Sequence, residues 1–110
     1  MNIQIFGKSK CFDTKKAERW FKERRIKFQS IDLVKVGISP GELKSVMAAV
    51  GLEALIDPRH PDAALLNYLA YDADKAEKLL EDPRLLKTPI VRNGRQATVG
   101  YCPEVWQSWS

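Results

Sequence analysis

The sequence has little of what several classes of protein require. Its two cysteines lie at opposite ends of the chain and it has one histidine, too few for a disulfide framework or a zinc site. No apolar run is long enough to span a membrane, and no signal-peptide pattern precedes the first strand. Repeats, linkers and low-complexity segments are absent. We therefore expect a soluble, cytoplasmic, single-domain protein (residues 1–110) with no membrane partner, no metal and no tightly bound cofactor.

The positive charge of the chain is dispersed. Eighteen lysines and arginines against 14 carboxylates give a formal net charge of +4, but acidic residues are interspersed and no long basic block occurs. Attraction of small anionic substrates explains this charge as well as nucleic-acid binding would, and we expect no direct nucleic-acid partner. Because 45% of the residues are hydrophobic, the chain can bury a core without disulfides or a structural metal ion.

Hydrophobic periodicity predicts alternating strands and helices. The expected strands are 2–6, 27–33, 88–92 and 95–100, and the expected helices are 14–24, 39–50, 62–70, 72–81 and a last one from 103. The first strand–helix–strand unit is expected to be parallel, and the last two strands to form a hairpin around a type I′ turn at Asn93-Gly94. Residues 38–84 would then form a helical bundle inserted into a core made of 1–34 and 86–110.

Local signals place several side chains. Asp13 or Thr14 would cap the first helix. Ser39 and Glu42 have the pattern of a capping box at the start of the second helix. His60 is expected to lie on the surface without a role. The residues expected to face inward from helix 62–70 are Leu65, Leu66 and Leu69, and those expected to share one face of the last helix are Val105, Trp106 and Trp109.

The stretch from residue 3 to residue 17 contains a cysteine in a position that is typical of a reactive thiol. An apolar strand leads through a loop to Cys11 at the start of a helix, where the unpaired N–H groups stabilise a thiolate. The lysines nearby push the thiol pKa below its usual value of about 8.5. Cys11 is therefore a candidate nucleophile, and the alternative is a small, inert thiol. The lysines concerned are Lys8, Lys10, Lys15 and Lys16.

The order of elements resembles the thioredoxin fold in its glutaredoxin-like variant. Four segments make the chain similar to the arsenate reductase and Spx-type family, in which a helical bundle is inserted between the second and third strands. These segments are IFGKSKCFDTKKAERWF, IDPRHPDAALL, LLKTPIVRNG and ATVGYCPEVW. The resemblance covers essentially the whole chain and implies an α/β fold with a four-stranded mixed sheet and a small inserted helical bundle.

The resemblance also implies roles for individual residues. Cys11 matches the family's nucleophile, Pro89 matches its cis-proline, and Thr88 would present backbone groups to a peptide or glutathione beside the sulfur. Arg59 matches an arginine near the active cysteine, with a solvated loop arginine as the alternative. The implied substrate-binding and anion-binding residues are Lys8, Ser9, Lys10, Thr14, Arg59, Thr88 and Pro89.

One departure from the family pattern concerns the oxyanion. Arsenate reductases of this type hold it with three arginines, whose guanidinium groups suit a tetrahedral anion. Two of the three are missing here, because Lys87-Thr88 precedes the proline and Tyr101 stands at the third position. The residues that would substitute for them are Lys8, Lys10, Arg59 and Arg92.

A second departure concerns the thiols. Spx-type regulators that sense oxidation carry a Cys-x-x-Cys pair, whereas here Thr14 takes the second position, where its hydroxyl would hydrogen-bond the thiolate. Cys102 is the one intramolecular partner available to Cys11, and the alternative is that Cys102 is a structural thiol.

We therefore expect a monothiol oxidoreductase in which the Cys11 thiolate attacks an oxidised or oxyanion substrate and glutathione, as co-substrate, resolves the mixed disulfide. The alternative is an Spx-like regulator that binds the RNA polymerase alpha subunit without turnover. A third interpretation is an accessory protein that only binds in the glutathione groove.

Overall fold

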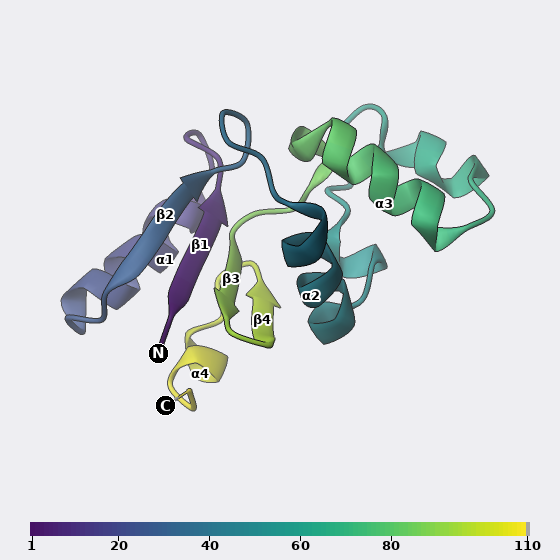
Figure 1. The fold of residues 1–110 in the computed structure, drawn as a ribbon. Coiled ribbons are helices and arrows are strands. Elements are labelled where there is room, and N and C mark those ends of the chain that lie inside the picture. The colour runs from purple at the N-terminus through teal and green to yellow at the C-terminus, as the bar shows by residue number, and fades with distance from the viewer. Residues whose placement is uncertain (110) are drawn as a thin grey trace.

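Four strands form one mixed sheet at the centre of the molecule. The computed structural model describes residues 1–109 and places the strands in the order β2-β1-β3-β4 (Figure 1). β1 pairs in parallel with β2 and antiparallel with β3, and β3 pairs antiparallel with β4. The predicted four-stranded mixed sheet is therefore confirmed. The strands are β1 (Ile3–Gly7), β2 (Phe28–Asp32), β3 (Ile90–Asn93) and β4 (Gln96–Val99).

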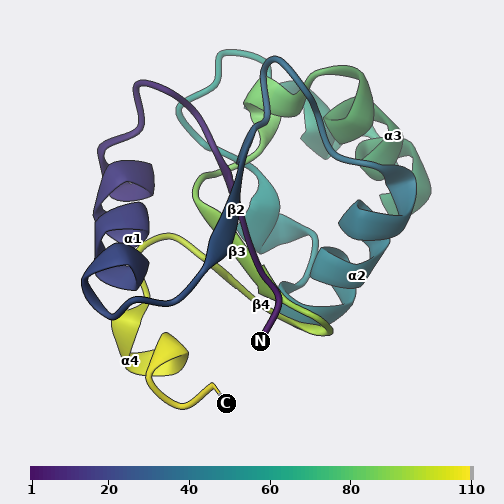
Figure 2. The ribbon, with the colours of Figure 1, turned by 60° about the vertical axis from the view of Figure 1, so that its left-hand side comes forward.

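Helices cover both faces of this sheet, which Figure 2 shows nearly edge-on. On one face lie α1 (Phe12–Glu23), which connects β1 to β2, and the short α4 (Pro103–Trp106). The segment between β2 and β3 covers the other face, as predicted for an inserted bundle. Its elements are α2 (Pro40–Val50), η1 (Glu53–Leu55), η2 (Ala63–Tyr68), α3 (Asp72–Glu81) and η3 (Pro83–Leu85). Within the described residues, no helix is both long and apolar enough to cross a membrane.

Alternation along β1 divides the core into two halves. Ile3 and Ile5 point to the α1 side, and Phe6 points to the inserted bundle, because successive side chains of a strand face opposite sides. On the α1 side, Trp106 is 2% exposed and its ring centroid lies 5.4 Å from that of Trp20. This aromatic packing holds the C-terminal helix against α1. Trp106 and Trp109 are both buried, as expected for residues that share one face. Val105 is exposed, so the prediction is wrong for this residue.

The helix predicted at 62–70 is a short 3₁₀ helix, η2. A 3₁₀ helix has three residues per turn, so Leu66 and Leu69 share its inner face, while Leu65 and Tyr68 share an outer one. Leu66 is buried and Leu69 packs partly buried against the same core, but Leu65 is 59% exposed. The prediction that Leu65 faces inward is wrong because it assumed the 3.6-residue repeat of an α-helix.

The hairpin turn lies one residue later than predicted. Asn93 pairs with Gln96, so the two loop residues are Gly94 and Arg95. Among the described residues outside glycine, positive φ occurs at Arg25 alone, so Gly94 (φ 62°) is the one loop residue with positive φ. A type I′ turn needs positive φ at both loop positions, whereas glycine at the first position alone is typical of type II′. The side chain of Asn93 instead accepts a hydrogen bond from the backbone N–H of Asn2.

The predicted capping box of α2 is confirmed. The Ser39 hydroxyl accepts a hydrogen bond from the backbone N–H of Glu42 at 3.1 Å, and the Glu42 carboxylate accepts one from the N–H of Ser39 at 3.0 Å. Two N–H groups at the start of the helix are thereby satisfied.

Close packing of α1 on β1 depends on Gly7. A Cβ at this position would lie 2.2 Å from Thr14 Cγ2 and 2.9 Å from Thr14 Oγ1. Because either Thr14 or the helix must then move, we expect Gly7→Ala to lower the free energy of unfolding by about 1–3 kcal/mol, measured by urea denaturation.

Gly41→Ala is the matched control. No atom lies within 4 Å of the Cβ position at Gly41, in the first turn of α2, so this substitution is expected to raise stability by about 0.4–1 kcal/mol. Wild-type stability in the Gly7→Ala variant would contradict the close approach of Thr14.

Candidate functional site

Cys11 is the N-cap residue of α1, directly after the loop that follows β1. Its backbone N–H donates to the carbonyl of Lys8 at 3.0 Å, and this turn starts the helix at Phe12. The helix therefore begins earlier than expected, and neither Asp13 nor Thr14 is its cap. Asp13 lies in the first turn, where the negative charge of its carboxylate interacts favourably with the positive end of the helix dipole.

The second component of the site is the Thr88–Pro89 peptide bond, which is cis, as the resemblance implied. The carbonyl oxygen of Thr88 accepts a hydrogen bond from the Cys11 thiol, with Sγ and O 3.6 Å apart. The pairing of Phe6 with Ile90 explains this contact, because it places the residues before β3 beside the loop after β1. Both Thr88 and Pro89 are buried.

The pKa of Cys11 is lowered from its ordinary value. Partial burial acts to raise the pKa, but hydrogen bonds with the side chains of Thr14 and Thr88 and with the backbone of Thr14 and Asp13 outweigh it. The Thr14 hydroxyl is buried and has no hydrogen-bond partner among the described residues, so the hydrogen bond that lowers the Cys11 pKa is one that it would donate to the ionised sulfur. Because the thiolate is an acceptor, this hydroxyl is available as a donor to it. The hydrogen bond from Thr14 to the thiolate stays a prediction.

Cys11 opens onto a groove of about 660 Å³. Four cationic side chains and two carboxylates line it, so its charge is net positive and attracts anions. Lys10, Arg59 and Lys87 are exposed in this groove. The lining residues are Lys8, Lys10, Cys11, Phe12, Asp13, Asp57, Pro58, Arg59, Lys87 and Thr88.

Lys8 has a structural partner within the groove. Its Nζ lies 3.5 Å from the Asp57 carboxylate and donates to the carbonyl of Arg84 at 2.9 Å. The charge of Lys8 is thus compensated, and its side chain joins the cysteine loop to the segment that carries Arg59. Lys8 therefore has a structural role within the groove, and its contact with substrate anions stays a prediction.

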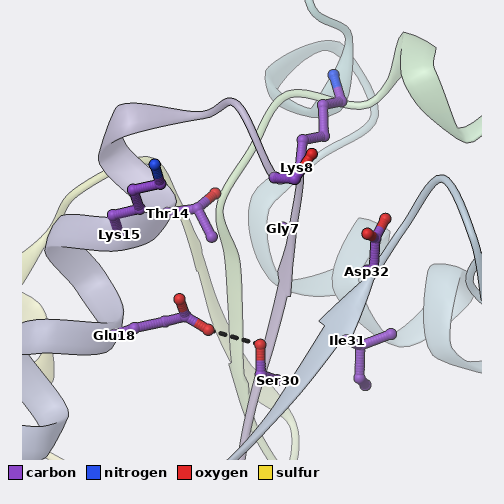
Figure 3. Close-up of a pocket in the computed structure, with 9 residues that line it drawn as sticks. Gly7, Lys8, Thr14, Lys15, Glu18, Ser30, Ile31 and Asp32 are labelled. Atoms are coloured by element: carbon purple, nitrogen blue, oxygen red, sulfur yellow. Dashed lines mark hydrogen bonds between the residues drawn. The ribbon is translucent and has the colours of Figure 1, made fainter.

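Ser9 lies outside this groove. It is exposed and lines a small pocket of about 130 Å³ between α1 and β2, on the other side of the loop. Figure 3 shows this pocket, with the Thr14 side chain directed from α1 toward Gly7 and a hydrogen bond from Ser30 to Glu18 across its lower part. Ser9 therefore does not line the groove at Cys11, and its predicted anion contact stays a prediction.

Arg92 lies away from the sulfur. It pairs with Gln4, three residues before the end of β1, and its Nη1 donates to the Gln4 side chain at 2.8 Å. Strand residues rise about 3.3 Å each, so Arg92 lies roughly 10 Å along the strand from the loop that carries Cys11. It does not replace a missing arginine of the anion site.

Tyr101 and Cys102 belong to the α1–α4 face. The Tyr101 ring packs edge-on against Trp106, with ring centroids 5.5 Å apart, and Lys16 Nζ lies 4.4 Å from the Tyr101 centroid. Cys102 is free and its thiol donates to the carbonyl of Val99 at 3.3 Å; burial raises its pKa. Neither residue lines the groove, which favours the structural alternative for Cys102.

His60 is more enclosed than expected. Its side chain is 13% exposed, its Nε2 lies 3.4 Å from the Asp82 carboxylate, and its Nδ1 accepts the N–H of Asp62 at 3.0 Å. His60, Asp62 and Asp82 bring one potential ligand atom each to within 4.8 Å of one another, an arrangement that exposed acidic groups also adopt without a metal ion. His60 ties the segment after Arg59 to the end of α3.

Five residues that line the groove were not among the predicted site residues: Phe12, Asp13, Asp57, Pro58 and Lys87. Phe12, beside the sulfur, is 75% exposed, and Asp57 and Lys87 form part of the wall opposite it. The sequence holds a signal for Lys87, which directly precedes Thr88. It holds none for Phe12, because an apolar residue in the first turn of an amphipathic helix is ordinarily assigned to the core.

The role of the Thr14 hydroxyl can be tested by Thr14→Val, which removes the donor and keeps the shape. We expect the pKa of Cys11 to rise, measured by pH-dependent alkylation in a Cys102→Ser background. Ser9→Ala is the control, since Ser9 lies outside the groove. An unchanged Cys11 pKa in Thr14→Val would contradict the hydrogen bond to the thiolate.

Comparison with known proteins gives consistent results. The sequence model of the ArsC family matches residues 6–109. The chain is 34% identical over 107 residues to the global transcriptional regulator Spx 2 of Oceanobacillus iheyensis, covering 92% of this chain and 78% of that one. Its fold is similar to that of an arsenate reductase from Vibrio cholerae, at 25% identity and a TM-score of 0.83, over 96% and 94% of the two chains. The glutaredoxin-like NrdH-redoxin from Escherichia coli matches with a TM-score of 0.54 at 14% identity, covering 100% and 96% of the chains.

Proposed function

We propose that this chain, which belongs to the ArsC family, is a thiol oxidoreductase with one nucleophile, Cys11, and with glutathione as thiol donor. Its thioredoxin-like fold is similar to those of an arsenate reductase and a glutaredoxin-like protein. The observation that carries the proposal is the setting of the Cys11 thiol. It has a lowered pKa, it caps a helix, and it opens onto a cationic groove beside the carbonyl of Thr88.

The proposed cycle has three exchange steps. The Cys11 thiolate attacks one sulfur of a substrate disulfide, the substrate S–S bond breaks, and the other sulfur leaves as a thiolate. A glutathione thiolate then attacks the mixed disulfide and releases the substrate thiol, and a second glutathione frees Cys11 as glutathione disulfide forms. Two glutathione molecules are oxidised and one disulfide is reduced. No second thiol near Cys11 is needed, which fits threonine at position 14.

An oxyanion such as arsenate would be reduced by the same thiolate. Cys11 displaces hydroxide from arsenic(V) to form an arsenic–sulfur bond. Glutathione then attacks the Cys11 sulfur to form a Cys11–glutathione disulfide, the arsenic–sulfur bonding pair remains on arsenic, and arsenic(III) leaves. A second glutathione frees Cys11 as glutathione disulfide forms. Lys10, Arg59 and Lys87 are the exposed cations that would offset the charge. With one arginine among them, the bidentate contacts that favour a tetrahedral anion are few, so a disulfide is the better substrate.

Replacement of the nucleophile tests this proposal. We expect Cys11→Ser to lose all measurable glutathione-dependent reduction of bis(2-hydroxyethyl) disulfide, because a serine hydroxyl is not ionised at neutral pH. Cys102→Ser should keep wild-type turnover, and thermal unfolding should show that both variants fold. Turnover by Cys11→Ser at the wild-type rate would remove the proposal.

A transcriptional regulator is the second candidate. The relative that is 34% identical carries the name of a global transcriptional regulator, and two of the three oxyanion arginines implied by the resemblance are absent. In this case the chain would bind the alpha subunit of RNA polymerase without turnover. Position 14 holds a threonine, so Cys11 has no neighbouring cysteine with which to form a local disulfide, and this counts against regulation by such a disulfide.

Binding to the isolated C-terminal domain of the alpha subunit separates the two candidates. For the proposed oxidoreductase we expect no retention of this chain on the immobilised domain, and full disulfide reductase turnover. Retention by both wild type and Cys11→Ser, together with absent turnover, would instead establish the regulator.

A further inference from the structure

The groove at Cys11 continues onto the inserted bundle. A second hollow of about 490 Å³ shares Pro58 and Lys87 with the groove and lies over η1 and η2. Three of its eight lining residues are alanines, and its two charged residues, Glu53 and Lys87, are of opposite sign, whereas the groove beside the sulfur is net positive. The lining residues are Glu53, Ala54, Ile56, Pro58, Ala63, Ala64, Asn67 and Lys87.

Backbone pairing fixes the wall that the two hollows share. The N–H of Lys87 donates to the carbonyl of Leu55, and the N–H of Asp57 donates to that of Leu85, each at 2.7 Å, around an antiparallel bridge between Ile56 and Leu86. This short ribbon runs directly into Thr88, whose carbonyl contacts the thiol. The second hollow therefore has a fixed position relative to the sulfur.

A ridge of exposed apolar side chains flanks the second hollow. In η2, Ala64 and Asn67 face the hollow, and Leu65 and Tyr68, three residues apart on the neighbouring face, are 59% and 85% exposed. These two side chains contribute nothing to the core, and next to the hollow they offer apolar surface to a partner. We use the name Leu65–Tyr68 ridge for this pair.

We propose that the second hollow and the Leu65–Tyr68 ridge form a subsite that binds an extended polypeptide segment of an oxidised protein substrate. This inference rests on the proposed function and names the substrate class of the same site. A free oxyanion or a low-mass disulfide is small enough to lie within the groove beside Cys11 without reaching the second hollow. A polypeptide whose cysteine reacts there places its following residues over Pro58 and Lys87 and onto the bundle.

The charges indicate the chemistry of this polypeptide. Lys10, Arg59 and Lys87 at the sulfur end favour acidic residues next to the reacting cysteine. The small side chains of the hollow and the Leu65–Tyr68 ridge favour apolar residues farther along. The matching partner is therefore a segment that is acidic around its cysteine and apolar on one side of it.

A chromogenic disulfide measures the first step directly. The probe is a nine-residue peptide with aspartates beside a cysteine that is disulfide-bonded to thionitrobenzoate, and two versions carry the apolar residues on opposite sides. The Cys11 thiolate attacks the peptide sulfur, the original S–S bond breaks, thionitrobenzoate leaves with the electron pair, and a Cys11–peptide disulfide remains. N-acetylcysteine amide with the same leaving group is the small comparison, and Cys102→Ser is the background throughout.

We expect one peptide version to have a second-order rate constant at least about tenfold above that of the small compound, equivalent to about 1.4 kcal/mol. Ala64→Trp fills the hollow and should lower this peptide-to-small ratio about tenfold. Tyr68→Ser removes part of the ridge and should lower it as well. The controls are Ala73→Trp and Tyr71→Ser, both at exposed positions outside the hollow, which should keep the wild-type ratio.

Each remaining outcome has a distinct meaning. Equal rate constants for peptide and small compound, or an unchanged ratio in both Ala64→Trp and Tyr68→Ser, would overturn the subsite while leaving the oxidoreductase intact. Failure of both compounds to release thionitrobenzoate would overturn the proposed function and, with it, this inference.

Discussion

The antiparallel pairing of β1 with β3 is the constraint on which the rest of the structure depends. It joins residues more than 80 positions apart and matches Phe6 with Ile90, both fully buried against the inserted bundle. A slip of one residue would turn these side chains to the other face of the sheet and expose apolar surface there. The same register sets Thr88 beside Cys11. The core and the candidate site are therefore fixed by one set of contacts.

Around the Cys11 sulfur, ion pairs and hydrogen bonds anchor the backbone, while the cationic side chains of Lys10, Arg59 and Lys87 are exposed in the groove. Lys8 joins the cysteine loop to Asp57, the Asp57 carboxylate also accepts the N–H of Arg59, and His60 contacts Asp82 at the end of α3. The segment that carries Arg59 is thus anchored on both sides of that residue. The Arg59 side chain itself is exposed in the groove. This division suits a site that must keep its geometry and accept different anionic groups.

Much of the fold could be predicted because its signals are local. The strand patterns, the capping box at Ser39 and the cysteine between a strand and a helix depend on neighbours in sequence, and the structure contains each of them. The failures depend on tertiary contacts. Leu65 faces out because the segment adopts a 3₁₀ helix, and Arg92 points to Gln4 because of its register in β3. No local pattern shows that Lys8 is compensated by Asp57, which is 49 residues away.

The uneven distribution of tryptophan has a practical consequence. All three tryptophans, Trp20, Trp106 and Trp109, belong to the core on the α1–α4 face, whereas the aromatic residues of the inserted bundle are the exposed tyrosines Tyr68 and Tyr71. Indole emission therefore reports the environment of one half of the molecule and is insensitive to loosening of the bundle. An unfolding transition followed by fluorescence alone describes the α1–α4 half, and a far-ultraviolet signal is needed to follow the other.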